Sequence, residues 1–177
     1  MIIIVAAARF EAEATLTQLH KKKVPFNFFE LGVGPLASAK ATQKLKSQVI
    51  DKHVIYLGTC GTFASFKAPE LITASKVHWQ PTCSRIGASR LVPGYDDPIE
   101  IHNHHSDLKN LPKKTVLTSP AVSLTNKFAC SILAQESQQM VENMELYPCL
   151  ESLILAKRLD IILATTNRVG PKGSQQW

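Results

Sequence analysis

Short, strongly apolar runs alternate along the chain with longer segments in which apolar residues recur at helical spacing. The runs predict strands because they are brief, rich in branched residues and bounded by glycine, proline or charged residues. We expect strands at Ile2–Ala7, Pro25–Leu31, His53–Leu57, Glu70–Val77, Thr115–Thr118 and Asp160–Thr165, and helices at Glu11–Lys22, Leu36–Gln48, Asn126–Ser137 and Glu145–Leu159. This alternation is typical of an α/β fold, in which helices cover the faces of a sheet.

The alternation fails between Gln80 and Pro112. This stretch contains several prolines, a pair of aspartates and the run His102-Asn103-His104-His105. We interpret it as a long excursion with at most one short strand, and not as a boundary between domains. A chain of 177 residues is long enough for one core, so residues 1–177 are expected to form a single domain.

Composition excludes several classes of protein. With 45% apolar and 19% charged residues, the chain has the composition of a globular protein and not of a disordered one. No apolar run approaches the roughly 18 residues of a membrane helix, and the first residues lack the basic region of a signal peptide, so we expect a cytoplasmic protein without membrane contact. The net charge of +6 arises from dispersed lysines, which do not predict a nucleic-acid partner. Four scattered cysteines without a CxxC pair predict free thiols.

Polar and glycine-rich segments follow the predicted strands, where the ligand crevice of an open α/β sheet lies. These segments are Arg9–Glu11, Gly32–Pro35, Gly58–Phe63 and Asn167–Gly170, and Met144 and Glu145 open the last predicted helix. Each glycine pair could be an ordinary turn, and either glutamate could be a favourable charge near a helix start. Together, two carboxylates facing each other across backbone donors are what general-base hydrolysis requires.

Five blocks carry a resemblance to a known family: "IIIVAAARFEAEATL", "LGVGPLASAKAT", "VIYLGTCGTF", "ENMEL" and "TTNRVGPKGSQQW". In this order and spacing they resemble the nucleoside phosphorylase and nucleosidase superfamily. Within it the chain looks most like the futalosine hydrolase branch, and methylthioadenosine/S-adenosylhomocysteine nucleosidases are more distant relatives. The resemblance implies a single-domain, three-layer phosphorylase/hydrolase-like fold with a central mixed sheet flanked by helices, from which the usual C-terminal helix is missing.

The resemblance also implies a reaction, the hydrolysis of the bond between ribose and a purine through an oxocarbenium-like state. It places Glu11 as the base that activates water, with Thr59 helping to hold that water. It places Met144 against the ribose and Glu145 as the acceptor of the ribose hydroxyls, which suits a carboxylate because each oxygen can accept a bond. Cys60 and Gly61 belong to the substrate-binding wall.

At the base, the resemblance places Asn167 opposite N7 of the purine, Val122 on the wall of the purine pocket and Trp177 as a stacking face. An asparagine NH2 can donate to both N7 and O6 of a 6-oxopurine, whereas an aspartate would repel that edge. Asparagine can also pair with an adenine edge, so adenine-type nucleosides stay open. Trp177 could equally be part of a disordered terminus.

Three interpretations remain at this stage. The first is a purine nucleosidase acting on futalosine, a precursor in menaquinone biosynthesis, or on a similar 6-oxopurine nucleoside, with the methylthioadenosine-type activity as its alternative. The second is a nucleoside-binding relative impaired in catalysis, because Leu163 stands where the resemblance implies an arginine. The third is a metal site made of His78, Cys83, His102, His104 and His105, although such a histidine run is usually solvated. The nucleosidase interpretation requires no cofactor and no metal. The resemblance also implies a homo-oligomer, most simply a dimer, in which residues of a neighbouring subunit help to close the site.

Overall fold

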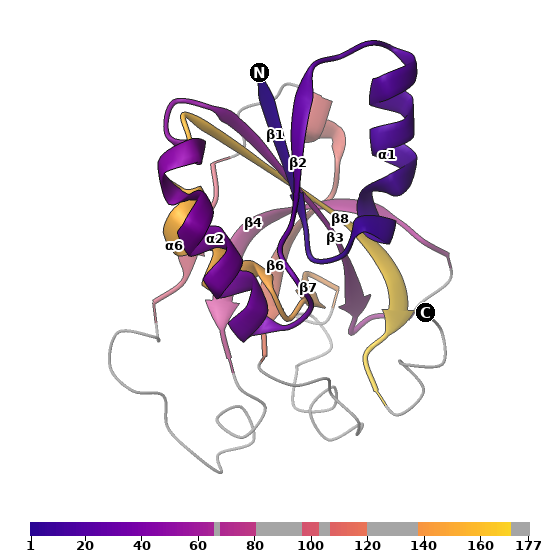
Figure 1. The fold of residues 1–177 in the computed structure, drawn as a ribbon. Coiled ribbons are helices and arrows are strands. Elements are labelled where there is room, and N and C mark those ends of the chain that lie inside the picture. The colour runs from indigo at the N-terminus through magenta and orange to yellow at the C-terminus, as the bar shows by residue number, and fades with distance from the viewer. Residues whose placement is uncertain (66–67, 81–96, 103–106, 120–137, 171–177) are drawn as a thin grey trace.

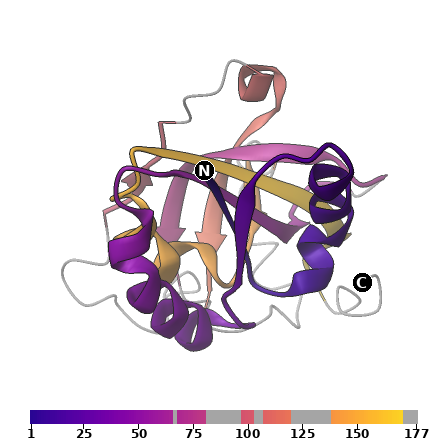
Figure 2. The same cartoon turned by 45° about the horizontal axis from the view of Figure 1, so that its top comes forward.

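The computed structural model describes residues 1–65, 68–80, 97–102, 107–119 and 138–170. These residues form one mixed, eight-stranded sheet with helices on both faces (Figures 1 and 2). The strands are β1 (Ile2–Ala6), β2 (Phe26–Glu30), β3 (His53–Thr62), β4 (Leu71–Trp79), β5 (Ile99–Glu100), β6 (Lys113–Thr118), β7 (Met140–Glu142) and β8 (Arg158–Arg168); the helices are α1 (Arg9–Lys21), α2 (Pro35–Val49) and α6 (Leu146–Leu153), with a 3-10 turn η1 at Asp107–Asn110.

The order of strands in the sheet brings the functional segments to one edge. Strands run in the order β2-β1-β3-β7-β6-β4-β5, and β8 pairs with β3 and β4. β1 lies parallel to β2 and β3, and β8 is also parallel to β3. The carboxyl ends of these four strands therefore meet at the same edge of the sheet, and the segments that follow them lie close together.

The helices make a three-layer arrangement because both faces of β1 are apolar. Ile3 and Val5 belong to the core that α2 and α6 cover, whereas Ile4 and Ala6 pack on the α1 side. Such burial on both faces explains why the strand reads as an uninterrupted apolar run. The α/β class, the central mixed sheet and the flanking helices are confirmed.

The prediction that β3 ends at Leu57 is wrong, because the strand continues to Thr62. Gly58 and Gly61 resemble turn residues in the sequence, but both lie inside the strand. A Cβ at Gly58 would lie 3.1 Å from Tyr56 Cε1 and 3.2 Å from Leu163 Cδ2. Glycine is required here because the Tyr56 and Leu163 side chains lie close to its Cα, and not because the chain turns. Thr59, Cys60 and Gly61 are thus strand residues and not loop residues.

The last predicted helix is also too long. α6 ends at Leu153, and β8 begins at Arg158 instead of Asp160. Leu155 and Ala156 donate to Ser152 and Leu153 in a closing turn, and Ala156 then pairs with Ile50. The chain must reverse here to place Arg158 opposite His53 in the β3–β8 register.

One strand was not predicted, and two of the predicted segments lie outside the described residues. The three-residue strand β7 was not predicted, since it is too short to show a period. The predicted helix Asn126–Ser137 and residues 171–177 lie outside the described residues. Within the described ranges, no helix combines the length and the apolar character needed to cross a bilayer.

A buried ion cluster joins the starts of β3 and β8. Asp160 is 3% exposed, and its Oδ2 accepts from His53 Nε2 at 2.7 Å and Arg158 Nε at 2.9 Å. Burial alone would raise the pKa of Asp160, but the bonds from His53 and Arg158 and their charges outweigh it, so the pKa lies below its usual value. The carboxylate therefore stabilises the folded state at neutral pH.

We predict that Asp160→Asn lowers the free energy of unfolding at pH 7 by about 2 kcal/mol, the usual cost of losing a hydrogen bond to a charged group. Because the folded pKa is depressed, the stabilisation is present above the unfolded pKa of about 3.9 and is lost as pH falls through the folded value. Urea unfolding at several pH values measures this. Glu100→Gln, in an exposed pair with Lys76, is the control and should change little. Equal losses in the two variants would contradict the assignment.

Candidate active site

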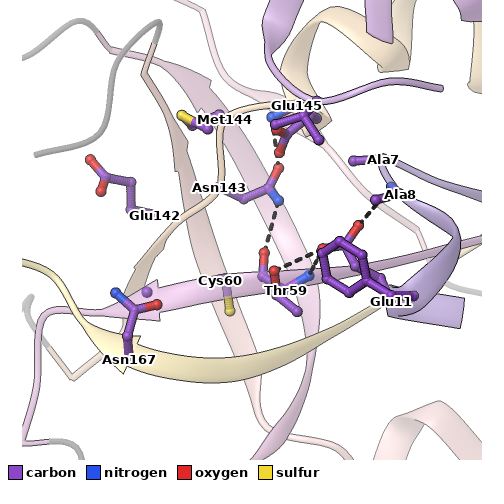
Figure 3. Close-up of a pocket in the computed structure, with 13 residues that line it drawn as sticks. Ala7, Ala8, Glu11, Thr59, Cys60, Glu142, Asn143, Met144, Glu145 and Asn167 are labelled. Atoms are coloured by element: carbon purple, nitrogen blue, oxygen red, sulfur yellow. Dashed lines mark hydrogen bonds between the residues drawn. The ribbon is translucent and has the colours of Figure 1, made fainter. Parts of the chain in front are cut away.

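A pocket opens at the carboxyl edge of β1, β3 and β8 (Figure 3). Seven residues with a predicted site role line it: Glu11, Thr59, Cys60, Gly61, Met144, Glu145 and Asn167. The structure adds Ala7, Ala8, Phe10, Val33, Glu142 and Asn143. Val122 and Trp177, both predicted to contact the purine, lie outside the described residues. All of the predicted site residues within the described ranges therefore lie in one pocket at this edge of the sheet.

Glu11 is held at the start of α1 by three donors. Its Oε1 accepts from the Thr59 amide at 2.9 Å and from the Thr59 hydroxyl at 2.7 Å, and its Oε2 accepts from the Ala8 amide at 3.2 Å. An ionised carboxylate offers about four acceptor positions. One position on Oε2 is therefore left to accept from a water or substrate hydroxyl, while the other contacts fix the orientation of the group.

Glu145 is a second carboxylate, placed just before α6. It is 6% exposed, and its Oε1 accepts from the Gly34 amide at 2.9 Å. Gly34 has a φ of +89°, a conformation that disfavours any side chain, so a glycine is needed to aim this amide. Burial raises the pKa of Glu145, and the negative charge of Glu11 adds to the rise, while the Gly34 amide opposes it.

Asn143 connects the backbone of Glu145 to that of Thr59, the residue that holds Glu11, and it was not predicted from the sequence. Its Nδ2 donates to the Thr59 carbonyl at 2.9 Å. Its Oδ1 accepts from the amides of Glu145 at 3.1 Å and Leu146 at 2.8 Å, which satisfies donors at the start of α6. An asparagine just before an apolar helical run is a recognisable capping signal, and that signal could have identified it.

Asn167 lies at the other end of the pocket, on β8. Its Nδ2 donates to the Arg168 carbonyl at 3.2 Å, and its Oδ1 accepts from the Thr166 hydroxyl at 3.1 Å. The neighbouring Gly61 is required by space, because a Cβ there would lie 2.8 Å from Val169 Cγ2 and 3.2 Å from Asn167 Nδ2. Val169 and the Asn167 amide fill the space that a side chain at Gly61 would need.

Cys60 is part of the pocket wall, and its thiol is not reactive. The thiol is buried, and burial raises its pKa to about 12. It therefore stays neutral at physiological pH and is a poor nucleophile. The other buried thiol in the described ranges, Cys149, behaves in the same way, with a pKa also raised to about 12.

Leu163 is a core residue and not a substitute for a cation. Its side chain is fully buried in the core cluster that also contains Tyr56. The described residues that line the pocket include three glutamates, Glu11, Glu142 and Glu145, and neither lysine nor arginine. The described lining therefore favours a cationic group and disfavours an anion.

The alternative metal site is only partly described. His102 is exposed, and Cys83, His104 and His105 lie outside the described residues. In the ranges that the structure covers, no group of three or more histidine, cysteine or acidic residues could hold a metal ion.

We predict that Glu145→Gln raises the free energy of unfolding at pH 7 by about 1 kcal/mol, the usual size of a stabilising substitution, because it removes a buried negative charge near that of Glu11. The glutamine oxygen can still accept from Gly34, and the buried charge is gone. Because the folded pKa is raised, the wild type loses stability as pH rises above the ordinary value of 4.5 towards the folded value, and the variant should not. Urea unfolding between pH 4 and 8 measures this. Identical pH profiles would contradict it, and exposed Glu13→Gln is the control.

Comparison with known proteins shows the fold. No protein-family model matches the sequence, and no curated protein sequence matches it. Solved structures do. A methylthioadenosine/S-adenosylhomocysteine nucleosidase from Helicobacter pylori has a TM-score of 0.73 and 12% identity over 99% of this chain and 88% of that one. A futalosine hydrolase mutant from Helicobacter pylori has a TM-score of 0.74 and 13% sequence identity, and the match covers 99% of this chain and 89% of that one. A methylthioadenosine/S-adenosylhomocysteine nucleosidase from Streptococcus pneumoniae, in complex with 8-aminoadenine, has a TM-score of 0.73 and 16% sequence identity. That match covers 98% of this chain and 88% of the nucleosidase. The chain has the fold of these nucleosidases.

Proposed function

We propose that this chain is a nucleosidase that hydrolyses the N-glycosidic bond of a purine nucleoside. The observation that carries the proposal is the arrangement of two carboxylates, Glu11 and Glu145, with the Thr59 hydroxyl in one pocket. Glu11 keeps one acceptor position after its three protein contacts, which is where a water would bind. The likeness in fold to solved nucleosidases supports the same reaction.

In the proposed reaction, water attacks the anomeric carbon while the bond to the purine nitrogen breaks. Glu11 takes one proton from the water, and the electron pair of the broken bond leaves with the base, which takes up a proton. Positive charge develops on the ribose in such a transition state. The glutamates that line the pocket stabilise that charge. The hydrogen bonds from Thr59 hold Glu11, the general base, in position before the reaction.

Glu145 and Met144 form the proposed ribose subsite. Glu145 uses one oxygen for the Gly34 amide, which leaves acceptor capacity for the ribose hydroxyls. Asn143 joins the backbone of Glu145 to that of Thr59. The water and ribose subsites are therefore tied to each other through one side chain, which keeps their spacing fixed during reaction.

Asn167 is the proposed contact to the leaving purine. One hydrogen of its NH2 group bonds to the Arg168 carbonyl, and the other can donate to the N7/O6 edge of a 6-oxopurine as negative charge moves onto the leaving purine. We infer a 6-oxopurine nucleoside as substrate, with futalosine as the first candidate, since a futalosine hydrolase is among the similar structures. A methylthioadenosine-type substrate is the alternative, because the similar structures include nucleosidases of that class.

Water, and not phosphate, is the proposed nucleophile. The described lining has three glutamates and no lysine or arginine, so a phosphate dianion would be repelled. We expect the protein to act in the cytoplasm as a homodimer, and light scattering after size-exclusion chromatography measures its oligomeric state.

A panel of nucleosides tests the proposal. Purified protein is incubated with futalosine, inosine and methylthioadenosine, with and without phosphate, and free base is followed by chromatography. The expected result is release of hypoxanthine from futalosine or inosine at a rate that does not depend on phosphate. Failure to release base from any of the three would contradict a nucleosidase.

The buried Leu163 favours a second candidate, a nucleoside-binding protein without turnover. The resemblance implies an arginine at this position, and a fully buried leucine cannot supply its charge. This candidate predicts that hypoxanthine binds to the pocket in calorimetry while no nucleoside is cleaved. The same panel, combined with that binding measurement, separates the two functions.

A further inference from the structure

The hydroxyl of Tyr56 on β3 is fully buried, and it has no hydrogen-bond partner in the part of the chain that the structure describes. A tyrosine hydroxyl usually finds a partner when it is buried, and an unpaired one destabilises the folded state. Phenylalanine would fill the same space without that cost. The hydroxyl therefore calls for a role other than packing.

The Tyr56 side chain lies along β3 and carries its hydroxyl towards the active site. A Cβ at Gly58 would lie 3.1 Å from Cε1 of the Tyr56 ring and 3.6 Å from its hydroxyl, so the end of the ring lies beside Gly58. The next residue, Thr59, donates to Glu11 through its amide and hydroxyl and accepts from Asn143 through its carbonyl. The buried hydroxyl is thus next to the strand segment that holds the general base.

Electrostatic effects also place the hydroxyl near the groups of the site. Burial is the main cause that raises the pKa of Tyr56 well above its usual value, and Cys149, Glu145 and Glu11 raise it further when they are ionised. The Asn143 side chain lowers this pKa, as a hydrogen-bond donor facing the phenol oxygen does. The phenol is therefore neutral at physiological pH, and its oxygen can accept a hydrogen bond.

Asn143 has one hydrogen left to donate. Its Oδ1 accepts from the amides of Glu145 and Leu146, and one Nδ2 hydrogen bonds to the Thr59 carbonyl. The second Nδ2 hydrogen has no partner in the described ranges, so it complements the unpaired oxygen of Tyr56. Figure 3 shows Asn143 between Glu145 and Thr59, which means that its amide group is tied to both sides of the site.

We propose that Tyr56 is a positioning residue, whose hydroxyl accepts a hydrogen bond from the second Nδ2 hydrogen of Asn143 when a ribose occupies the site. In the proposed function the ribose hydroxyls bind Glu145, whose backbone amide donates to Asn143 Oδ1 at 3.1 Å. Binding at Glu145 therefore acts on the Asn143 amide, and the Tyr56 oxygen holds that amide in its new position. The inference rests on the proposed function, because it takes Glu145 as the ribose contact. It does not require cleavage of the nucleoside.

Inosine binding tests this proposal in a protein that does not turn over. Calorimetry measures the Kd for inosine and for hypoxanthine in Glu11→Gln, with and without Tyr56→Phe. Loss of one buried hydrogen bond in the occupied site should weaken inosine binding by about tenfold. Hypoxanthine has no ribose, so its Kd should change by less than about threefold. A packing role alone would not separate the two ligands.

Urea unfolding without ligand gives a second measurement. Tyr56→Phe should have a midpoint at or above that of the unmodified protein, because the substitution removes an unpaired buried hydroxyl. Tyr147→Phe is the matched control. It makes the same chemical change in a ring that contacts Trp79 and is not among the described residues that line the pocket, so both Kd values should stay unaltered.

Asn143→Ser identifies the partner of the hydroxyl. Serine can still accept from the amides at the start of α6, but it lacks the second amide hydrogen. In this background Tyr56→Phe should change the Kd for inosine by less than about twofold, since the bond that it removes is already absent. A tenfold loss that persists in Asn143→Ser would contradict Asn143 as the donor.

Three other results would overturn the proposal: an unchanged Kd for inosine in Tyr56→Phe, equal weakening of inosine and hypoxanthine, or a lowered urea midpoint. The last result includes failure of the variant to fold, and it would show that the hydroxyl stabilises the protein without ligand. Absence of inosine binding while Tyr56 is present would contradict the ribose subsite and this inference together. The expected loss of inosine binding, combined with no cleavage by the unmodified protein, would support the role of Tyr56 and contradict only the nucleosidase.

Discussion

Replacing Glu11 by glutamine should lower kcat for base release by about a thousandfold, within the range that general-base catalysis usually supplies. The glutamine oxygen can still accept from the Thr59 amide and hydroxyl, which bind Oε1 at 2.9 and 2.7 Å. The NH2 group then takes the place of Oε2, the oxygen that has an acceptor position left. It cannot take a proton from water, so the chemical step is lost. The two Thr59 contacts are kept, and the Ala8 amide loses its acceptor.

Binding of the purine should survive this substitution, because Glu11 and Asn167 lie at opposite ends of the pocket. The Kd for hypoxanthine should change by less than about threefold, the scatter expected for a distant site. Steady-state release of the purine at saturating substrate measures kcat, and calorimetry measures the Kd for hypoxanthine. Glu13→Gln on the same helix is the matched control, since Glu13 forms an exposed pair with Arg9. Full activity in a folded Glu11→Gln protein would show that this carboxylate is not the base.

Asn167→Asp should lower the ratio of kcat/KM for 6-oxopurine over 6-aminopurine nucleosides by about a hundredfold, the size of a lost or reversed two-point base contact. An aspartate of the same shape can still accept from the Thr166 hydroxyl, but its second oxygen has no hydrogen to donate to N7 or O6. It would also face the Arg168 carbonyl, to which the amide now donates. Repulsion should therefore act on the oxo edge.

Competition between inosine and adenosine in one reaction measures this ratio directly. Asn110→Asp, an exposed position on η1, is the control for the same chemical change and should leave the ratio unaltered. An unchanged ratio in Asn167→Asp, with normal unfolding, would mean that the purine edge is read elsewhere.

The general architecture could be predicted because alternation of apolar runs and amphipathic segments is a local property. The glycines show where local reasoning fails. Gly58 and Gly61 were interpreted as turn residues, yet each lies within β3 and makes room for side chains from neighbouring strands. Their role depends on Leu163, Val169 and Asn167, which are about a hundred residues away in the sequence. The local pattern of apolar and polar residues does not show that these distant residues lie beside the two glycines.

The site could be predicted in part for a similar reason. Glu11 and Asn167 were found because each follows or ends a parallel strand, and such ends meet at one edge. Glu142 was not predicted because its position depends on β7, a strand of three residues whose pairing with Gly61 and Thr62 is not visible in the sequence. For Asn143 the sequence does contain a signal, an asparagine just before an apolar helical run. Both residues line the pocket, Glu142 at the end of β7 and Asn143 directly after it.

Hydrolysis in oxygen-18 water tests the central claim most directly. The protein is incubated with futalosine or inosine in labelled water, and the sugar and base products are analysed by mass spectrometry. If Glu11 activates water against the anomeric carbon, free hypoxanthine should appear together with a sugar that carries one labelled oxygen at that carbon, and Glu11→Gln should form neither. Intact nucleoside after prolonged incubation with folded protein, or release of base without label in the sugar, would contradict this account.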